Sequence, residues 1–184
     1  MNIFEKNDRF RGDPYGWLPR GENAGVSFVK MKPLSVDDIK RFTSQLFFVE
    51  ADPGDGVFIP NGSVGVTRDF GPCSAAILTG INDYSWLGHL KPGTGIPPEH
   101  VQQIRRDINA GSQLNIALVG GCEFNRTGMG SYRQSQIVTI QKQFADSGLS
   151  VAIQAYWNPV ADSWMFAAVH ANFGHAIATV AYEL

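Results

Sequence analysis

The chain has 184 residues, a formal net charge of −2 and an apolar content of 43%. This length and composition predict one domain with a substantial core and argue against disorder. The charge balance offers no footprint for nucleic acid, and two cysteines with 48 residues between them give neither a disulfide framework nor a zinc pattern. We therefore expect a protein of a reducing compartment that binds no nucleic acid.

The N-terminal third predicts an arm followed by a domain. Its first residues lack the basic start and apolar core of a signal peptide, and no apolar run is long enough to cross a bilayer. We expect a cytoplasmic protein without membrane insertion, or an effector delivered into a host cell. Residues 1–33 are rich in Gly, Pro, Asp and Arg and predict an extended arm, either a tail or docked through Phe10 and Trp17. Residues 34–184 are expected to form a single domain.

The next segment predicts a helix and a hairpin. Ser35 can cap a helix whose first turn carries acidic residues and whose apolar residues recur at helical spacing as far as Leu46. Asn61-Gly62 then separates two alternating apolar runs, which predicts a β-hairpin whose second strand leads to Thr67. Residues 68–72 have turn chemistry, so Thr67 is expected near Cys73.

A second hairpin is predicted from Cys73 to Leu90, with turn residues between its two apolar runs. If the turn is centred on Ile81, Cys73 lies directly opposite His89, with Cβ atoms about 4.5–5.5 Å apart. A thiol and an imidazole at that separation are a candidate nucleophile and base. A slip of one residue would put them on opposite faces. The alternative is a small buried cysteine beside a histidine with satisfied hydrogen bonds.

The remaining chain predicts two helices and four strands. His100, in the first turn of the first helix, is expected to face solvent. His170 and His175 flank the last turn without a cysteine or carboxylate cluster, so no metal site is expected. The glycine-rich segments lack both phosphate-binding patterns, so no nucleotide or other cofactor is expected. The predicted elements are a helix from Pro98 to Gly111 with a face of Val101, Ile104 and Ile108, a strand over Asn115–Val119, a helix over Ser131–Ser147 with a face of Ile137, Ile140 and Phe144, and strands over Leu149–Trp157, Trp164–His170 and His175–Tyr182.

Three segments resemble the CheD chemoreceptor glutamine deamidases, and the resemblance covers roughly residues 57–184. Thr67-Arg-Asp-Phe-Gly-Pro-Cys73 resembles the family's Thr-x-x-x-Gly-Ser-Cys segment, and Trp86-Leu-Gly-His89-Leu-Lys-Pro92 its Gly-x-x-His-x-x-Leu-Pro segment. Leu114 to Cys122, followed by Gly128-Met-Gly130, is similar to a strand ending in Gly-Gly-Ala and a helix start. Cys122 stands at the alanine position and is expected to be a buried filler.

The resemblance implies an α+β sandwich with mostly antiparallel sheets and about three helices on one face. It also implies a cysteine-dependent protein-glutamine deamidase in which Cys73 is the nucleophile, His89 the base and Thr67 the residue that orients the imidazole. Cytotoxic necrotizing factor and Burkholderia lethal factor toxins share this arrangement, so the implied partner is either a chemoreceptor or a host protein carrying a target glutamine. Pro72 departs from the family serine and has no N–H to donate. A non-catalytic binding module and a Cys-His protease or transglutaminase remain alternatives.

Overall fold

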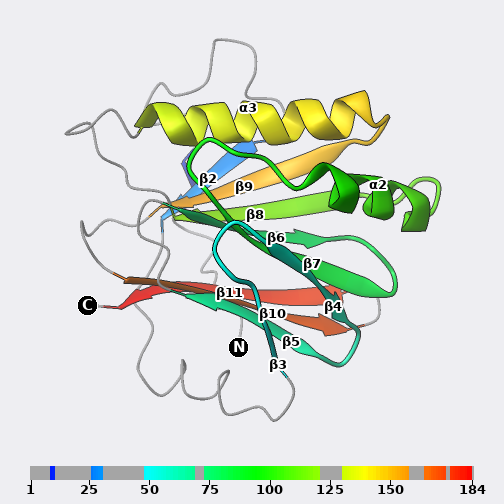
Figure 1. Ribbon diagram of the computed structural model, residues 1–184, viewed down its shortest axis with the longest axis horizontal. Coiled ribbons are helices and arrows are strands. Elements are labelled where there is room, and N and C mark those ends of the chain that lie inside the picture. Colours follow the sequence, from blue (N-terminus) through cyan, green and yellow to red (C-terminus); the bar gives the residue numbers. More distant parts are fainter. Residues whose placement is uncertain are drawn as a thin grey trace.

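The computed structural model describes residues 9–10, 26–30, 48–68, 73–120, 130–157, 164–172 and 175–183. These residues form an α+β fold, mostly of strands, in which two β-sheets stack and two helices cover the outer face of the larger sheet (Figure 1). The strands are Arg9–Phe10 (β1), Val26–Lys30 (β2), Phe48–Glu50 (β3), Gly56–Pro60 (β4), Val64–Arg68 (β5), Ser74–Thr79 (β6), Tyr84–Leu90 (β7), Leu114–Gly120 (β8), Val151–Trp157 (β9), Trp164–Asn172 (β10) and His175–Glu183 (β11), and the helices are Pro98–Asp107 (α2) and Gly130–Asp146 (α3).

Both sheets are rich in antiparallel pairs, as the sequence predicted. The larger sheet has the strand order β1-β2-β9-β8-β6-β7-β4, and the smaller has the order β11-β10-β5-β3. Among the described strands, three pairs are parallel: β2 with β9, β8 with β9, and β3 with β5. Strands β6 and β7 form the predicted antiparallel hairpin near the edge of the larger sheet, which places both candidate site segments side by side.

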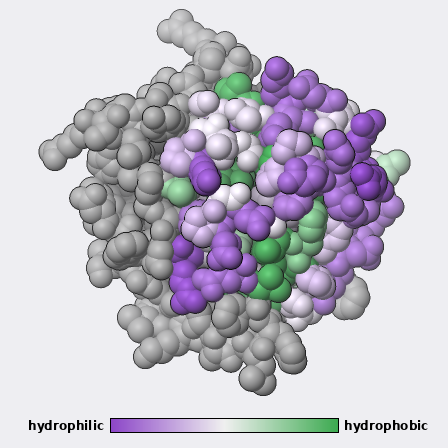
Figure 2. All heavy atoms as spheres, in the orientation of Figure 1, coloured by the Kyte–Doolittle hydropathy of each residue, from purple (hydrophilic) through white to green (hydrophobic). Residues whose placement is uncertain are grey.

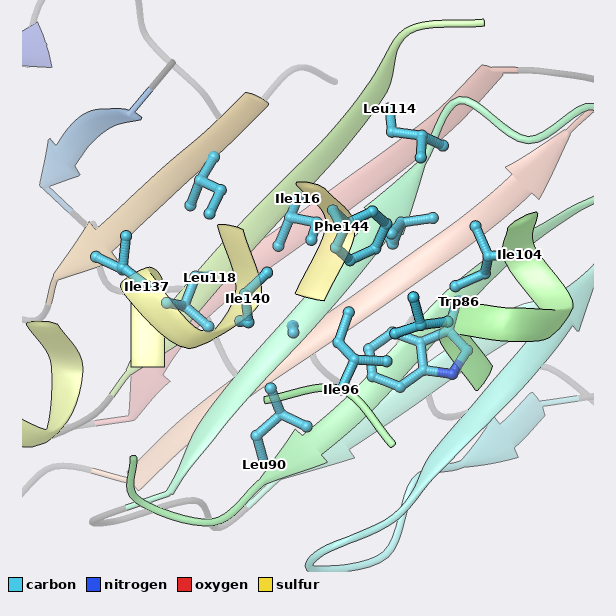
Figure 3. Close-up of a cluster of buried hydrophobic side chains, with 14 of the residues drawn as sticks. Trp86, Leu90, Ile96, Ile104, Leu114, Ile116, Leu118, Ile137, Ile140 and Phe144 are labelled. Carbon is cyan, nitrogen blue, oxygen red and sulfur yellow. The ribbon is translucent and has the colours of Figure 1, made fainter. Parts of the chain in front are cut away.

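One hydrophobic core lies between the larger sheet and the helices (Figure 3). The predicted helix face of α3 is confirmed, because Ile137, Ile140 and Phe144 are fully buried. Gly148 follows the helix with a φ of 72°, the left-handed conformation that ends many helices. Even-numbered residues of β6 and β7 supply the sheet side of this core, among them Ala76, Leu78, Trp86 and Leu90.

A second core fills the space between the two sheets. Odd-numbered side chains of the larger sheet, such as Ile77 on β6, Leu87 on β7 and Val119 on β8, meet Val169 of β10 there. Because side chains alternate along a strand, Cys73 and His89 belong to this same inter-sheet face. The candidate site therefore lies at one end of the layer between the sheets, away from the helices.

The turn at Asn61-Gly62 forms, but the predicted hairpin around it is wrong. Ser63 N donates to Pro60 O over 3.0 Å, and Gly62 has a φ of 85°. The strands on either side enter different sheets, since β4 pairs with β7 whereas β5 pairs with β10 and β3. The reason is burial, because side chains on both faces of β5 are buried from Val64 to Thr67. A strand so enclosed needs hydrogen-bonding partners on both edges and a layer packed over its side chains. A two-stranded hairpin with β4 would supply a partner on one edge only. Ile59 of β4 supplies part of that layer over Gly65.

Part of the predicted N-terminal arm is a strand of the larger sheet. Residues 26–30 pair in parallel with β9, and residues 9–10 pair with them in turn. The sequence Val-Ser-Phe-Val-Lys has a high β-propensity, but it is short and the residues around it are rich in Gly and Pro, so no strand was predicted here. The helix predicted from Ser35 lies outside the described residues.

Helix α2 is fastened to β7 by two side-chain hydrogen bonds. Trp86 Nε1 donates to His100 Nδ1 over 3.2 Å, and the Tyr84 hydroxyl donates to Asp107 Oδ2 over 2.8 Å. His100 is therefore half-buried and packs edge-on against Phe58, whereas the sequence predicted a solvent-facing residue. The helix also ends earlier than predicted, with Ile108 as its C-cap.

The described surface is mainly hydrophilic on the side shown in Figure 2, with apolar residues visible as a narrow band. Among the described residues, Val49 on β3 is the large hydrophobic side chain with the clearest exposure, at 37%. Neither described helix has both the length and the apolar composition that a bilayer crossing requires.

Candidate functional site

Thr67 and His89 form a buried hydrogen bond between the two sheets. Thr67 Oγ1 lies 3.0 Å from His89 Nδ1, and the two residues are 0% and 2% exposed. Thr67 is on β5 of the smaller sheet and His89 is on β7 of the larger one. The contact therefore depends on the stacking of the sheets, and it joins two of the three residues that the sequence singled out.

A third group fixes the direction of this hydrogen bond. Thr67 Oγ1 also donates to the carbonyl oxygen of Ala51 over 3.0 Å. A hydroxyl has one proton and a carbonyl can only accept, so that proton is committed to Ala51. Thr67 Oγ1 must then accept from His89, which assigns the proton of the neutral imidazole to Nδ1. The lone pair consequently resides on Nε2, the tautomer that a general base requires.

The segment from Ala51 to Gly56 also holds the backbone of His89. His89 N donates to Asp55 O over 2.9 Å, and Gly54 N donates to His89 O over 2.7 Å. The imidazole is thus positioned by the contact of its ring with Thr67 and by the hydrogen bonds of the His89 backbone. Sequence reasoning did not find this segment, because backbone groups carry no residue signature; its Pro53-Gly-Asp-Gly run signals only a turn.

The predicted pairing of Cys73 directly with His89 is wrong by two residues. In the β6–β7 ladder Ala75 faces His89 and Ser74 faces Leu90, so the turn is centred on Asn82. Ile81, the predicted centre, is instead 3% exposed and packs in the helix-side core. A shift of two leaves the facing of every side chain unchanged. Cys73 is accordingly a diagonal neighbour of His89 on the same face, a relation with Cα atoms about 7–8 Å apart.

Two opposing influences act on the Cys73 thiol. Burial among inter-sheet residues raises its pKa, the Lys91 ammonium lowers it, and burial dominates, so the pKa stays above its ordinary value. A thiol with a raised pKa is protonated at neutral pH and becomes a nucleophile only when a base removes its proton. His89 lies on the same sheet face and carries its lone pair on Nε2.

The part of the chain that the structure describes holds no cluster of metal ligands, and comparison with known proteins assigns no family. Among the described residues, no group of three or more His, Cys, Asp and Glu side chains could hold a metal ion. No protein-family model matches the sequence, and no curated protein matches it significantly. Pro72 and Cys122 lie outside the described residues, as does the turn that joins Thr67 to Cys73.

The Thr67 hydroxyl can be tested by removing it alone. Thr67→Val keeps the side-chain shape but leaves the Nδ1 proton of His89 and the carbonyl oxygen of Ala51 without their partner. Unsatisfied buried groups of this kind cost about 1–3 kcal/mol, so we expect urea unfolding to report that loss. Nitrogen NMR of the imidazole should also show a mixture of tautomers.

Thr67→Ser is the matched control, because it retains the hydroxyl and removes only a methyl group. Its imidazole should keep the Nδ1–H tautomer. A valine variant with an unchanged tautomer would contradict the assigned hydrogen-bond direction.

Proposed function

We propose that this protein is a cysteine-dependent protein-glutamine deamidase, with Cys73 as nucleophile, His89 as general base and acid, and Thr67 as the residue that orients the imidazole. The observation that carries the proposal is the buried Thr67–His89 hydrogen bond of 3.0 Å, whose direction leaves the lone pair on Nε2 of a histidine that pairs with Ala75 of β6. The resemblance of the Thr67–Cys73 and Trp86–Pro92 segments to CheD deamidases supports the same roles.

The reaction begins when His89 Nε2 takes the proton of the Cys73 thiol. The resulting thiolate attacks the side-chain amide carbon of a protein-bound glutamine, and the carbonyl π electrons move to oxygen. The imidazolium then gives its proton to the amide nitrogen, ammonia leaves, and a thioester remains. His89 next takes a proton from water, and the hydroxide attacks the thioester carbon. The carbon–sulfur bond breaks to release glutamate, and the imidazolium returns its proton to the Cys73 thiolate.

The developing oxyanion requires N–H donors, and the backbone N–H of Cys73 is the candidate closest to the sulfur. Pro72 has no N–H, so the position before the nucleophile contributes none. A hydroxyl rather than a carboxylate orients His89, which leaves the imidazole less basic than in a triad with aspartate. This weaker base favours a mechanism in which proton transfer accompanies substrate attack.

Intact-mass analysis of candidate substrates is the test. Wild-type protein and Cys73→Ala are each incubated with a chemoreceptor cytoplasmic fragment and with host GTPases and translation factors, the substrates that the resemblance implies. We expect a gain of about 1 Da per converted glutamine, with release of ammonia, for the wild type alone.

Other products would support the other Cys-His enzymes. Peptide cleavage in place of the mass gain would indicate a protease, and incorporation of an added primary amine would indicate a transglutaminase. If wild type and Cys73→Ala bind the same protein equally and leave its mass unchanged, the domain is a binding module and the proposed chemistry is wrong.

A further inference from the structure

Lys91 immediately follows β7 and lies across from Cys73. The β6–β7 ladder runs from Leu78 with Trp86 to Ser74 with Leu90. Continued by one residue in the same register, it puts Cys73 opposite Lys91. Directly opposed residues of an antiparallel pair are cross-strand neighbours on one face, so the lysine is closer along the ladder to Cys73 than His89 is.

The backbone of Lys91 is held firmly in this position. Its carbonyl oxygen accepts three hydrogen bonds, from Thr94 N at 3.1 Å, Thr94 Oγ1 at 2.8 Å and Gln136 Nε2 at 3.2 Å. Gln136, on α3, is 1% exposed and also donates to Thr94 O over 2.9 Å. A buried residue of a helix thereby anchors the loop after β7, while the Lys91 side chain itself is exposed.

The Lys91 side chain lies against Gly54, in the segment that holds His89. A Cβ at Gly54 would lie 2.7 Å from Lys91 Cε and 3.3 Å from Nζ, and Gly54 has a φ of 88°. Glycine here both permits the left-handed backbone and leaves room for the lysine. The ammonium is consequently directed over the same segment that binds the backbone of His89.

Other titratable groups belong to the same elements of the fold. The elements beside Cys73 carry His89 on β7, Asp52 and Asp55 on the Ala51–Gly56 segment, and the Arg68–Glu50 ion pair at 2.9 Å next to Thr67. Among the described residues, the charge that lowers the pKa of Cys73 is that of Lys91. No described carboxylate forms an ion pair with this lysine.

We propose that Lys91 supplies the positive charge that stabilises the Cys73 thiolate, a role that rests on the proposed deamidase function. When the sulfur gives its proton to His89 Nε2, it acquires a negative charge at a half-buried position just before β6. The ammonium of Lys91 offsets part of the cost that burial imposes on this charge. Lys91 acts through the sulfur and exchanges no proton in the reaction.

The pH dependence of Cys73 alkylation tests this role without requiring a substrate. Wild type, Lys91→Met and Lys91→Arg are treated with iodoacetamide across a range of pH, and peptide mass analysis separates Cys73 from Cys122. We expect Lys91→Met to shift the rate profile to higher pH and to lower the rate at pH 7 by about threefold or more, because the thiolate fraction falls. Lys91→Arg keeps the charge and should keep the profile.

Salt gives a second measurement on the unaltered protein. Raising the salt from about 0.02 M to about 0.5 M screens an exposed ammonium, so wild-type alkylation should slow while alkylation of Lys91→Met should not. Coinciding low-salt profiles of wild type and Lys91→Met, or a wild-type rate independent of salt, would overturn the proposal.

The two proposals can fail separately. If Lys91→Met shifts the alkylation profile but no protein is deamidated, the charge assignment stands and the deamidase function falls. If glutamine conversion requires Cys73 while Lys91→Met leaves the profile unchanged, the function stands and the role of Lys91 is wrong. Circular dichroism of each variant verifies that it is folded.

Discussion

Replacing His89 with alanine is expected to lower glutamine deamidation by about 10³-fold, as severely as replacing Cys73 with alanine. The Cys73 thiol has a pKa raised by burial, so without a base it stays protonated at neutral pH. In the proposed mechanism the same imidazole also protonates the departing nitrogen. If the two residues act as one unit, as proposed, the double variant should lose no more activity than either single variant.

The measurement is ammonia release from a protein substrate, read together with the intact mass of that substrate. His100→Ala is the control, since this histidine is half-buried on the helix side and bonds Trp86 rather than Thr67. It should retain deamidase activity. Activity that survives His89→Ala but is lost in His100→Ala would move the base to the other histidine.

Trp86→Ala is expected to cost about 3–5 kcal/mol of unfolding free energy, the largest stability effect of any single side chain discussed for this fold. The indole is fully buried and covers Gly56 and Gly88, which face each other across β4 and β7. A Cβ on either glycine would overlap the ring. Without side chains on these glycines, the neighbouring strands have nothing with which to fill the cavity.

Urea unfolding followed by circular dichroism measures this loss. Tyr84→Phe is the comparison on the same strand: it removes only the hydroxyl that donates to Asp107 at an exposed site, so a change below about 1 kcal/mol is expected. Equal midpoints for the two variants would show that the Trp86 ring does not stabilise the fold as its burial implies.

Local periodicity predicted where helices and strands lie along the chain. It did not predict the register and the partners of the strands, which depend on long-range contacts. The face of α3 follows from Ile137, Ile140 and Phe144 alone, and the last three strands follow from their apolar runs. The register of β6 with β7 depended instead on where Ile81 points, which the helix-side core decides. The two strands on either side of Asn61-Gly62 likewise enter different sheets, because both faces of β5 are buried. The local sequence pattern does not show which segments will cover those faces.

The candidate site, like the fold, was predicted only in part from the sequence. The resemblance implied that Thr67 orients His89, and the structure has a hydrogen bond between the Thr67 hydroxyl and the imidazole. The roles of Ala51 and Asp55 were not predictable, since both act through carbonyl oxygens that every residue possesses. The sequence did not suggest the proposed role of Lys91, because that role depends on its register opposite Cys73 and the predicted register was wrong by two residues.

The Thr67–His89 hydrogen bond also makes the site sensitive to residues that never touch it. Its donor and acceptor are built on separate layers, so the spacing of those layers determines its length. Replacing a small residue of the inter-sheet core, such as Ala75, with a larger one would increase the distance between the two sheets and lengthen this hydrogen bond. The proposed deamidase activity would then depend on the distance between the two sheets, and substitutions within the inter-sheet core could adjust it.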